Sequence, residues 1–119
     1  MIEVEMKKYE NSIVYYIKGT TTLHREDGPA LTDELGEDWF YKGDLHRDGG
    51  PAVERKDGTK EWYINGRLHR EDDPAVIYGD GDLEWCLNGT FFESKEEWFE
   101  ALTESQKEKA LYSEYFMRG

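Results

Sequence analysis

Hydrophobic residues recur along this chain in short runs that are rich in aromatic residues and end at a glycine. The runs are YYIKG (residues 15–19), WFYKG (39–43), WYING (62–66) and WCLNG (85–89). Each run is predicted to end a β-strand, and the first belongs to a strand over residues 12–18 that follows another over 2–6. The chain is therefore expected to consist mainly of short strands.

A second pattern, rich in charge, alternates with these runs. LHREDGPA occupies residues 23–30, LHRDGGPA residues 45–52 and LHREDDPA residues 68–75, so the copies begin 22 and 23 residues apart. That period is too short for a pair of helices and predicts a two-stranded hairpin as the unit. A triple occurrence also argues against one active site within the motif.

Turn residues set the predicted pairing of the strands. Asp-Gly at residues 57–58 and Asn-Gly at 65–66, repeated at 80–81 and 88–89, are typical of two-residue type I′ turns. The first turn would pair Val53 with Trp62, and the second would pair Tyr63 with Leu68.

These registers give the polar motif residues a structural interpretation. Each histidine is expected to lie against the aromatic residue of the preceding strand, as His69 on Trp62, His46 on Trp39 and His24 on Tyr15. Later arginines are expected to face carboxylates, as Arg70 with Glu61 and Arg47 with Asp38. The motif prolines would start the next strand, where a missing N–H donor does least damage.

The carboxyl-terminal segment has a different pattern. SKEE at residues 94–97 matches a helix capping box. Apolar residues follow at helical spacing, and Thr103 is expected to restart the helix. The residues of this stripe are Trp98, Phe99, Leu102, Leu111, Tyr112, Tyr115 and Phe116. Such a tail would cover the last hairpin and protect its edge from pairing with another chain.

The predicted fold class is mainly β with a carboxyl-terminal α cap: an antiparallel β-hairpin repeat sheet closed by one or two short helices. A chain of 119 residues is expected to form a single domain. Its predicted parts are amino-terminal strands (1–22), about three hairpin repeats (23–93) and a helical cap (94–119). With one cysteine, no apolar span long enough for a bilayer and no signal-peptide pattern, the protein is expected to be soluble and cytoplasmic.

Charge is concentrated in the repeats. The net charge is −12 overall but 0 over residues 1–22, −9 over residues 23–89 and −3 over residues 90–119. This distribution disfavours nucleic acid and anionic lipid as direct partners and favours a partner with a basic surface.

Catalytic and metal-binding interpretations find little support in the pattern. Histidines on successive hairpins would lie about 10 Å apart, which is too far for shared zinc ligation. Paired carboxylates such as Glu26 and Asp27 lie in turn-rich segments without a predicted means of separating their pKa values. Cys86 takes the place of Phe40 and Tyr63 in the other units and is interpreted as a small packed residue. No catalytic residue, metal site or cofactor is predicted.

The stretch LHREDGPA…DWFYKGDLHRDGGPAVERKDGTKEWYINGRLHRED resembles the MORN-like repeat proteins of bacteriophages and large viruses. Those proteins carry the same His-Arg, Gly-Pro-Ala and Trp-x-x-Asn-Gly pattern, and FFESKEEWFEAL is similar to their strand-to-helix ending. The resemblance covers about residues 15–89 and implies an architecture rather than an activity. Two departures concern turns: Asp73 replaces the glycine of the third Gly-Pro-Ala, and Lys42 replaces the turn asparagine of the first unit.

The expected function is that of a non-catalytic acidic protein that binds and inhibits a host protein complex. It would be a phage-encoded counter-defence factor in the host cytoplasm whose carboxylates mimic nucleic-acid charge. The predicted partner-binding acids are Glu26, Asp27, Asp48, Asp57, Glu71, Asp72, Asp73 and Asp80. Exposed aromatic residues would add docking contacts at Phe40, Tyr63 and Tyr78.

Two alternatives stay open. The chain could be an oligomeric sponge that traps a nucleotide between aromatic side chains and the arginines Arg25, Arg47 and Arg70. In that case at least one arginine should be released from its carboxylate and face a cleft. The third interpretation is a structural or assembly module, and the sequence leaves the oligomeric state open.

Overall fold

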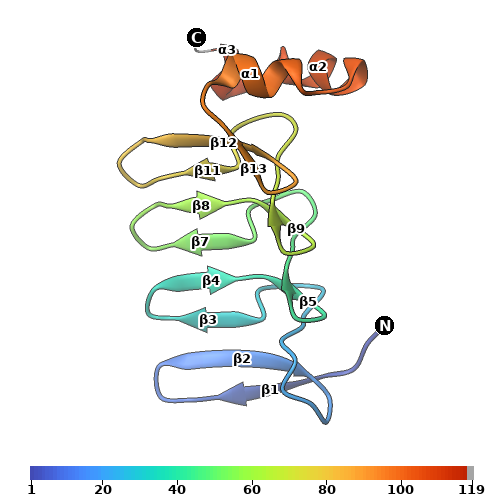
Figure 1. Cartoon of the computed structure of the whole chain (residues 1–119). Helices are drawn as coiled ribbons and strands as arrows, with labels where there is room; N and C mark the ends of the chain where they lie inside the picture. Colours follow the sequence, from blue (N-terminus) through green and yellow to red (C-terminus); the bar gives the residue numbers. More distant parts are fainter. Residues whose placement is uncertain (118–119) are drawn as a thin grey trace.

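The chain folds into a large meandering antiparallel β-sheet with short helices at its carboxyl-terminal end (Figure 1). This structure, a computed structural model, describes residues 1–117 and the side chains of residues 1–115. Nine strands follow one another across the sheet in the order β1-β2-β3-β4-β7-β8-β11-β12-β13. The predicted mainly-β class with a helical carboxyl-terminal end is confirmed at this level.

The strands are short. Those of the sheet are β1 Val4–Lys8, β2 Ser12–Ile17, β3 Leu31–Asp33, β4 Gly36–Asp38, β7 Val53–Arg55, β8 Lys60–Glu61, β11 Val76–Ile77, β12 Leu83–Leu87 and β13 Thr90–Phe92. Two small hairpins stand beside it, formed by β5 Phe40–Tyr41 with β6 Asp44–Leu45 and by β9 Tyr63–Ile64 with β10 Arg67–Leu68.

The tryptophan of each aromatic run marks where the chain leaves the sheet. Trp39 alone separates β4 from β5, and Trp62 alone separates β8 from β9. Figure 1 shows β5 and β9 turned away from the direction of the sheet strands. β12 instead continues through Trp85, so that it pairs with β11 at its start and with β13 at its end. The aromatic runs therefore connect the sheet with a second set of turns.

The Asn-Gly turns form as predicted. Ile64 pairs with Arg67 and Tyr63 with Leu68, which is the predicted register. Both turn residues have positive φ, 49° at Asn65 and 81° at Gly66, as a type I′ turn requires.

The Asp-Gly turns differ from the prediction. Val53 pairs with Glu61 rather than with Trp62, because the loop contains three residues instead of two. The Arg55 N–H donates to the Thr59 carbonyl at 2.8 Å, and only Gly58 of the loop has positive φ, at 96°. This is a turn followed by a left-handed glycine, the usual three-residue hairpin loop, and it shifts the register by one residue. The loop at residues 79–81 has the same hydrogen bonds.

The alanine of each Gly-Pro-Ala segment lies at the centre of the packing. Ala30, Ala52 and Ala75 have no exposed surface. Their N–H groups donate to the carbonyl oxygens of the neighbouring strand at 2.8–2.9 Å. Each proline lies two residues before a strand, a position at which the sheet needs no N–H donor from it.

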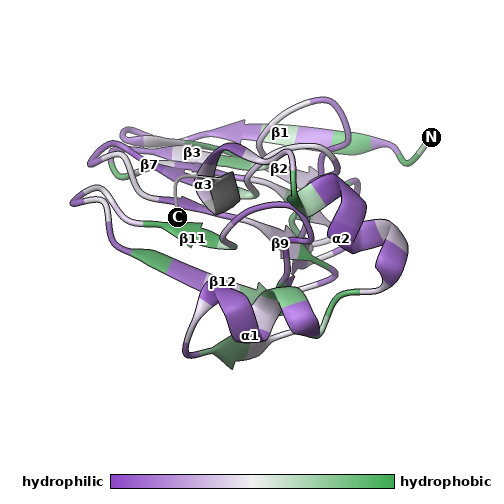
Figure 2. Ribbon diagram, turned by 90° about the horizontal axis from the view of Figure 1, so that it is seen from above, coloured by the Kyte–Doolittle hydropathy of each residue, from purple (hydrophilic) through white to green (hydrophobic). Residues whose placement is uncertain are grey.

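Three helical segments cover the last strands: α1 Lys95–Glu100, α2 Glu104–Ala110 and α3 Glu114–Met117. Trp98 is fully buried and its ring lies 4.6 Å from that of Trp85, centroid to centroid. Figure 2 shows hydrophobic segments on β11 and β12, and β12 runs toward α1. Leu102 and Ala110 complete this core, so the helices pack against β12 of the last hairpin.

The predicted apolar stripe fails beyond α2. Leu111 is 46% exposed and Tyr112 is 88% exposed, because the helix ends at Ala110 and the chain turns before α3. The Phe116 side chain lies outside the described residues. Ser94 accepts from the Glu97 N–H as predicted, whereas the reciprocal capping box is formed by Thr103 and Gln106. No helix of the described residues is long and apolar enough to span a membrane.

Lys42 provides a test of the turn chemistry. It adopts φ 49° in the same turn in which the other units have asparagine, a conformation that costs an ordinary L-residue about 1 kcal/mol. Lys42→Asn is expected to raise the free energy of unfolding by about 0.5–1 kcal/mol, and Asn65→Lys to lower it similarly. Urea denaturation of both variants measures this; a loss of stability in Lys42→Asn would contradict the assignment.

Candidate functional site

The motif histidines make the same backbone contacts in every copy. Each histidine N–H donates to the carbonyl oxygen of the preceding aromatic residue at 3.0–3.1 Å. Each imidazole Nδ1 accepts from a turn N–H of the following aromatic run: His24 from Lys42 (2.8 Å), His46 from Asn65 (3.0 Å) and His69 from Asn88 (2.9 Å). One side chain thus connects two segments that are 18 or 19 residues apart in the chain.

This geometry fixes the tautomer of the rings. An imidazole whose Nδ1 accepts a hydrogen bond carries its proton on Nε2. The Nε2 atom of His69 lies 2.7 Å from Glu71 and that of His46 lies 3.3 Å from Asp48. His24 is fully buried, and within the described residues its Nε2 has no hydrogen-bond partner. Its nearest carboxylate oxygen, on Glu26, is 3.8 Å away.

The side chain that covers each aromatic ring is the arginine. The distance from the guanidinium carbon to the ring centroid is 4.1 Å for Arg25 over Tyr15, 3.9 Å for Arg47 over Trp39 and 3.8 Å for Arg70 over Trp62. The predicted placement of histidine against the aromatic residue therefore holds for the backbone only. β6 and β10 end before the histidines, so the regular alternation of a ladder does not apply there.

The arginine partners also differ from the prediction. Arg70 binds Asp72 at 2.9 Å rather than Glu61, and Arg47 binds Glu54 at 3.3 Å rather than Asp38. The predicted acceptors have other donors: Arg55 binds Asp38 at 2.9 Å, and the Tyr63 hydroxyl donates to Glu61 at 3.0 Å. All three motif arginines also donate to the carbonyl oxygen of their own proline, at 3.2 Å.

Asp73 is a structural residue rather than part of a docking surface. It is 7% exposed, lies 3.4 Å from Arg70 and accepts from the Tyr115 N–H at 3.1 Å. The equivalent Gly28 leaves room for its arginine, because a Cβ there would approach the Arg25 guanidinium carbon to 2.6 Å. In the third copy the added carboxylate contacts the start of α3, and its burial leaves little of this predicted partner-binding residue accessible.

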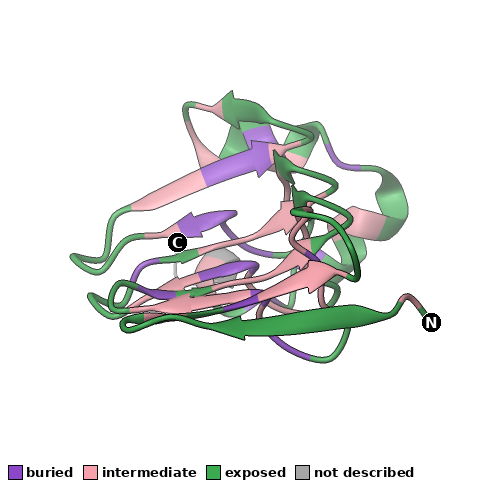
Figure 3. Ribbon diagram, turned by 90° about the horizontal axis from the view of Figure 1, so that it is seen from below, coloured by how far each residue is buried: buried purple, intermediate pink, exposed green. Residues whose placement is uncertain are grey.

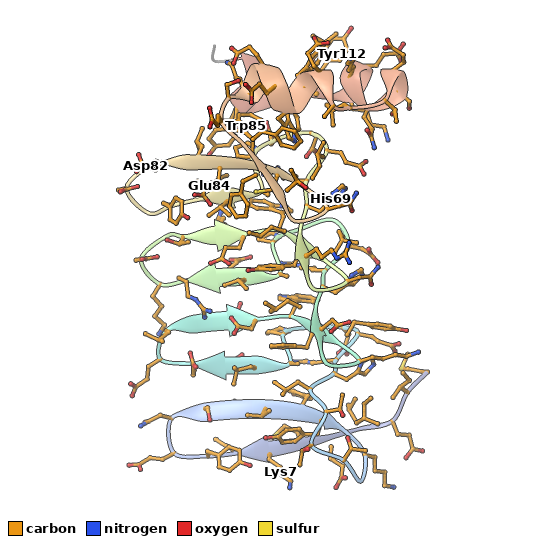
Figure 4. The ribbon with its side chains drawn as sticks, viewed as in Figure 1. Lys7, His69, Asp82, Glu84, Trp85 and Tyr112 are labelled. Atoms are coloured by element: carbon orange, nitrogen blue, oxygen red, sulfur yellow. The ribbon has the colours of Figure 1, made fainter. Side chains whose placement is uncertain are left out.

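The other predicted partner-binding acids are exposed, but they occupy two separate edges of the sheet. We call one the motif edge, formed by Glu26, Asp27, Asp48, Glu71 and Asp72. The other, the hairpin-tip edge, lies at the left in Figure 1 and includes the exposed acids Glu10, Glu34, Asp57, Asp80 and Asp82. Figure 4 labels Asp82 at this edge and His69 on the opposite side. The acids therefore cannot form one continuous surface along a single edge.

The two edges differ in the contacts that their carboxylates make. On the motif edge, carboxylates lie within 3.3 Å of a histidine or arginine of their own motif at Asp27, Asp48, Glu71 and Asp72. On the hairpin-tip edge, Asp57 and Asp80 accept turn N–H groups at 2.8 and 2.9 Å. The Thr59 hydrogen bonds lower the pKa of Asp57 and so favour its charged form.

The predicted docking aromatics are only partly available. Phe40 and Tyr63 are half-buried, whereas Tyr78 is exposed. Burial and the nearby Glu61 raise the pKa of Tyr63 to about 12, so its hydroxyl acts as a donor. Cys86 is fully buried, and desolvation raises its pKa to about 11, which opposes formation of a thiolate.

Two cavities lie between successive motif copies. A cavity of about 410 Å³ is lined by Arg25, Trp39 and Arg47, and another of about 490 Å³ is lined by Arg47, Trp62, Arg70 and Lys109. Arg47 lines both cavities. In the other two copies an aspartate, Asp27 or Asp72, accepts a hydrogen bond from the arginine Nε. Gly49 occupies that position in the second copy, so Arg47 has no such aspartate. Among the described residues, no group of three or more His, Cys, Asp or Glu could hold a metal ion.

Comparisons of the chain with protein-family models, with curated proteins and with solved structures find no match.

The histidine contact can be tested at His24, whose ring is fully buried. His24→Ala is expected to lower the free energy of unfolding by about 2–4 kcal/mol, because it removes a buried ring and the acceptor for the Lys42 N–H. His24→Asn keeps an acceptor oxygen near the Nδ1 position and should recover part of that loss. Urea denaturation compares the two; equal destabilisation would contradict the role of the acceptor.

Proposed function

We propose that this chain is a non-catalytic acidic protein that binds a basic surface of a host protein complex and inhibits it. The observation that carries the proposal is the row of exposed carboxylates along the hairpin-tip edge. Among the described contacts, Glu34, Asp57 and Asp80 form no ion pair, so their charge is available to a partner. We place the docking surface on this edge.

The charge density suits a competitor of nucleic acid. Counted over both edges, the chain carries a net charge of −12 over a length of 45 Å, or about one net negative charge per 4 Å. A nucleic-acid strand has one phosphate about every 3.4 Å. Successive hairpin tips are about 10 Å apart, since each hairpin contributes two strands. A basic groove therefore has about three phosphate positions for each hairpin tip, and the exposed acids of that tip could occupy one or two of them.

The geometry of the motif supports a non-catalytic function. Its imidazole Nδ1 atoms, guanidinium groups and most of its carboxylates are engaged within the chain. A general base needs a free lone pair within reach of the substrate. In each of these rings the Nδ1 lone pair already accepts a hydrogen bond from a turn N–H. The motif residues act as structural contacts, and the unpaired acids act as the binding groups.

The proposal includes an origin and a setting. The repeated His-Arg, Gly-Pro-Ala and Asn-Gly residues support membership of the MORN-like repeat proteins of bacteriophages and large viruses. A small acidic protein of that class would act as a counter-defence factor in the host cytoplasm. A basic nucleic-acid-binding complex would be its target, without direct contact to nucleic acid or membrane.

Neutralisation of the hairpin tips tests this function. The tip variant combines Glu34→Gln, Asp57→Asn and Asp80→Asn, which removes three charges and keeps the oxygens that accept turn N–H groups. The matched control combines Asp27→Asn, Asp48→Asn and Asp72→Asn on the motif edge. Capture of partners from a nuclease-treated bacterial lysate is expected to fall roughly tenfold in the tip variant, with much less loss in the control.

High salt should release the partner from the wild-type protein, because the docking contacts are exposed charges. Identification of the captured proteins by mass spectrometry should show a basic nucleic-acid-binding complex. An equal loss of partner capture in both variants would show that net charge alone is responsible. A loss of capture in the control variant only would place the docking surface on the motif edge. Either result, or capture that resists salt, contradicts the proposal.

A second candidate function has support at Arg47. The 490 Å³ cavity is lined by two guanidinium groups and the exposed Lys109 ammonium, together with the carboxylates of Glu71 and Asp72. Arg47 there lacks the aspartate that binds Nε in the other copies. The cations of this cavity suit an anionic ligand such as a nucleotide. The protein would then act as a ligand sponge.

Binding of ATP or GTP in equilibrium dialysis tests the sponge. Lys109→Ala is expected to weaken binding roughly tenfold, because it removes one of the cations of the cavity. Lys60→Ala removes an exposed lysine that does not line the cavity and should leave binding unchanged. The absence of binding to the wild-type protein, and of a nucleotide in its heat-released fraction, would rule this candidate out.

A further inference from the structure

The two ends of the sheet are unlike each other. At one end, α1 packs against β12, next to the last strand, β13. At the other end β1 is the outermost strand, and all five of its residues are exposed. Figure 3, seen from this end, shows β1 exposed along its whole length. An edge strand of this kind presents a row of N–H and C=O groups to another chain.

The hydrogen bonds to β2 identify which groups of β1 point outward. The Lys18 N–H donates to Glu3 O and the Tyr9 N–H to Ser12 O, so residues 3, 5, 7 and 9 direct their backbone groups toward β2. Val4, Met6 and Lys8 therefore direct their N–H and C=O groups away from the sheet. A partner strand would have to bond to these three residues.

The side chains of β1 favour a second copy of the same strand. In an antiparallel pair centred on Met6, Val4 lies opposite Lys8 of the other copy, and Met6 lies opposite Met6. Glu5 then lies opposite Lys7 twice, once on each side of the two-fold axis. Shifting the register by two residues would place Glu5 opposite Glu5 or Lys7 opposite Lys7, so of these three registers only the one centred on Met6 has no like charges opposite each other.

The distribution of charge and of apolar residues agrees with this partner. Residues 1–22 have no net charge, whereas residues 23–89 carry −9, so two copies repel each other least at this end. Val4 is 37% exposed, Met6 54% and Ile13 36%. They share one face, since Met6 pairs with Tyr15 and Lys8 with Ile13, and the two-fold axis brings both patches together.

We propose that two copies of the chain associate through β1, in an antiparallel pair centred on Met6 that joins their sheets edge to edge. The pair forms six backbone hydrogen bonds between Val4, Met6 and Lys8 of each copy, together with two Glu5–Lys7 contacts. The association does not depend on the proposed function, because both hairpin-tip edges stay exposed in the dimer.

The test is a charge exchange read out by sedimentation equilibrium of the full chain over a range of concentrations. The wild-type protein is expected to reach twice the chain mass of 14.0 kDa. Lys7→Glu places glutamate opposite glutamate and should raise the dimer Kd by roughly tenfold or more. Glu5→Lys combined with Lys7→Glu restores opposite charges and should restore the dimer.

Lys60→Glu is the matched control, since it makes the same charge change at an exposed residue of β8, which four strands of the sheet separate from β1, and should leave the dimer intact. A wild-type protein that stays monomeric at all concentrations would overturn the proposal. So would a Lys7→Glu variant that dimerises as well as Lys60→Glu, or a double exchange that fails to restore the dimer while it melts at the same temperature as the wild type.

Discussion

The structure depends on one contact, the hydrogen bond from a turn N–H to the Nδ1 of a motif histidine. The bond recurs at 2.8–3.0 Å in all three copies of the motif. Short strands of two or three residues bury little surface, and an isolated hairpin of that size is barely stable in water. The imidazole adds a contact between segments that such short strands do not provide, because it connects the turn of one aromatic run to the motif that precedes it. The arginine next to the histidine covers the preceding aromatic ring and donates to the carbonyl oxygen of the motif proline, so it connects these two segments as well.

This use of the motif explains why a segment so rich in reactive groups is compatible with a binding protein. Imidazole, guanidinium and carboxylate groups are strong hydrogen-bonding groups as well as catalytic ones, and here they satisfy backbone groups that short strands leave without partners. The charges that stay available lie elsewhere, on the hairpin tips and on the exposed strand β1. We therefore expect function at the edges of the sheet, whereas the motif contacts stabilise the fold.

Local signals predicted much of this fold. Asn-Gly dictated the turns at residues 65–66 because both positions require positive φ, and Lys42 shows that the turn persists even with a less suitable residue. Asp-Gly was ambiguous, since it suits both a two-residue and a three-residue loop, and the observed loop moved the register by one residue. The arginine stacking could not be derived from strand pairing, because the motif lies beyond the ends of β6 and β10. Asp73 was assigned to the surface because its contact with Tyr115 spans 42 residues and has no local signal.

Long-range proton–nitrogen NMR correlation of the imidazole rings would show whether the three motif histidines accept hydrogen bonds through Nδ1. The Nε2–H tautomer is expected for His24, His46 and His69 alike. The N–H groups of Lys42, Asn65 and Asn88 are expected to exchange with solvent as slowly as those of the core strands. Rings that carry a proton on Nδ1, or turn amides that exchange as fast as those of exposed loops, would show that the histidines do not hold the turns.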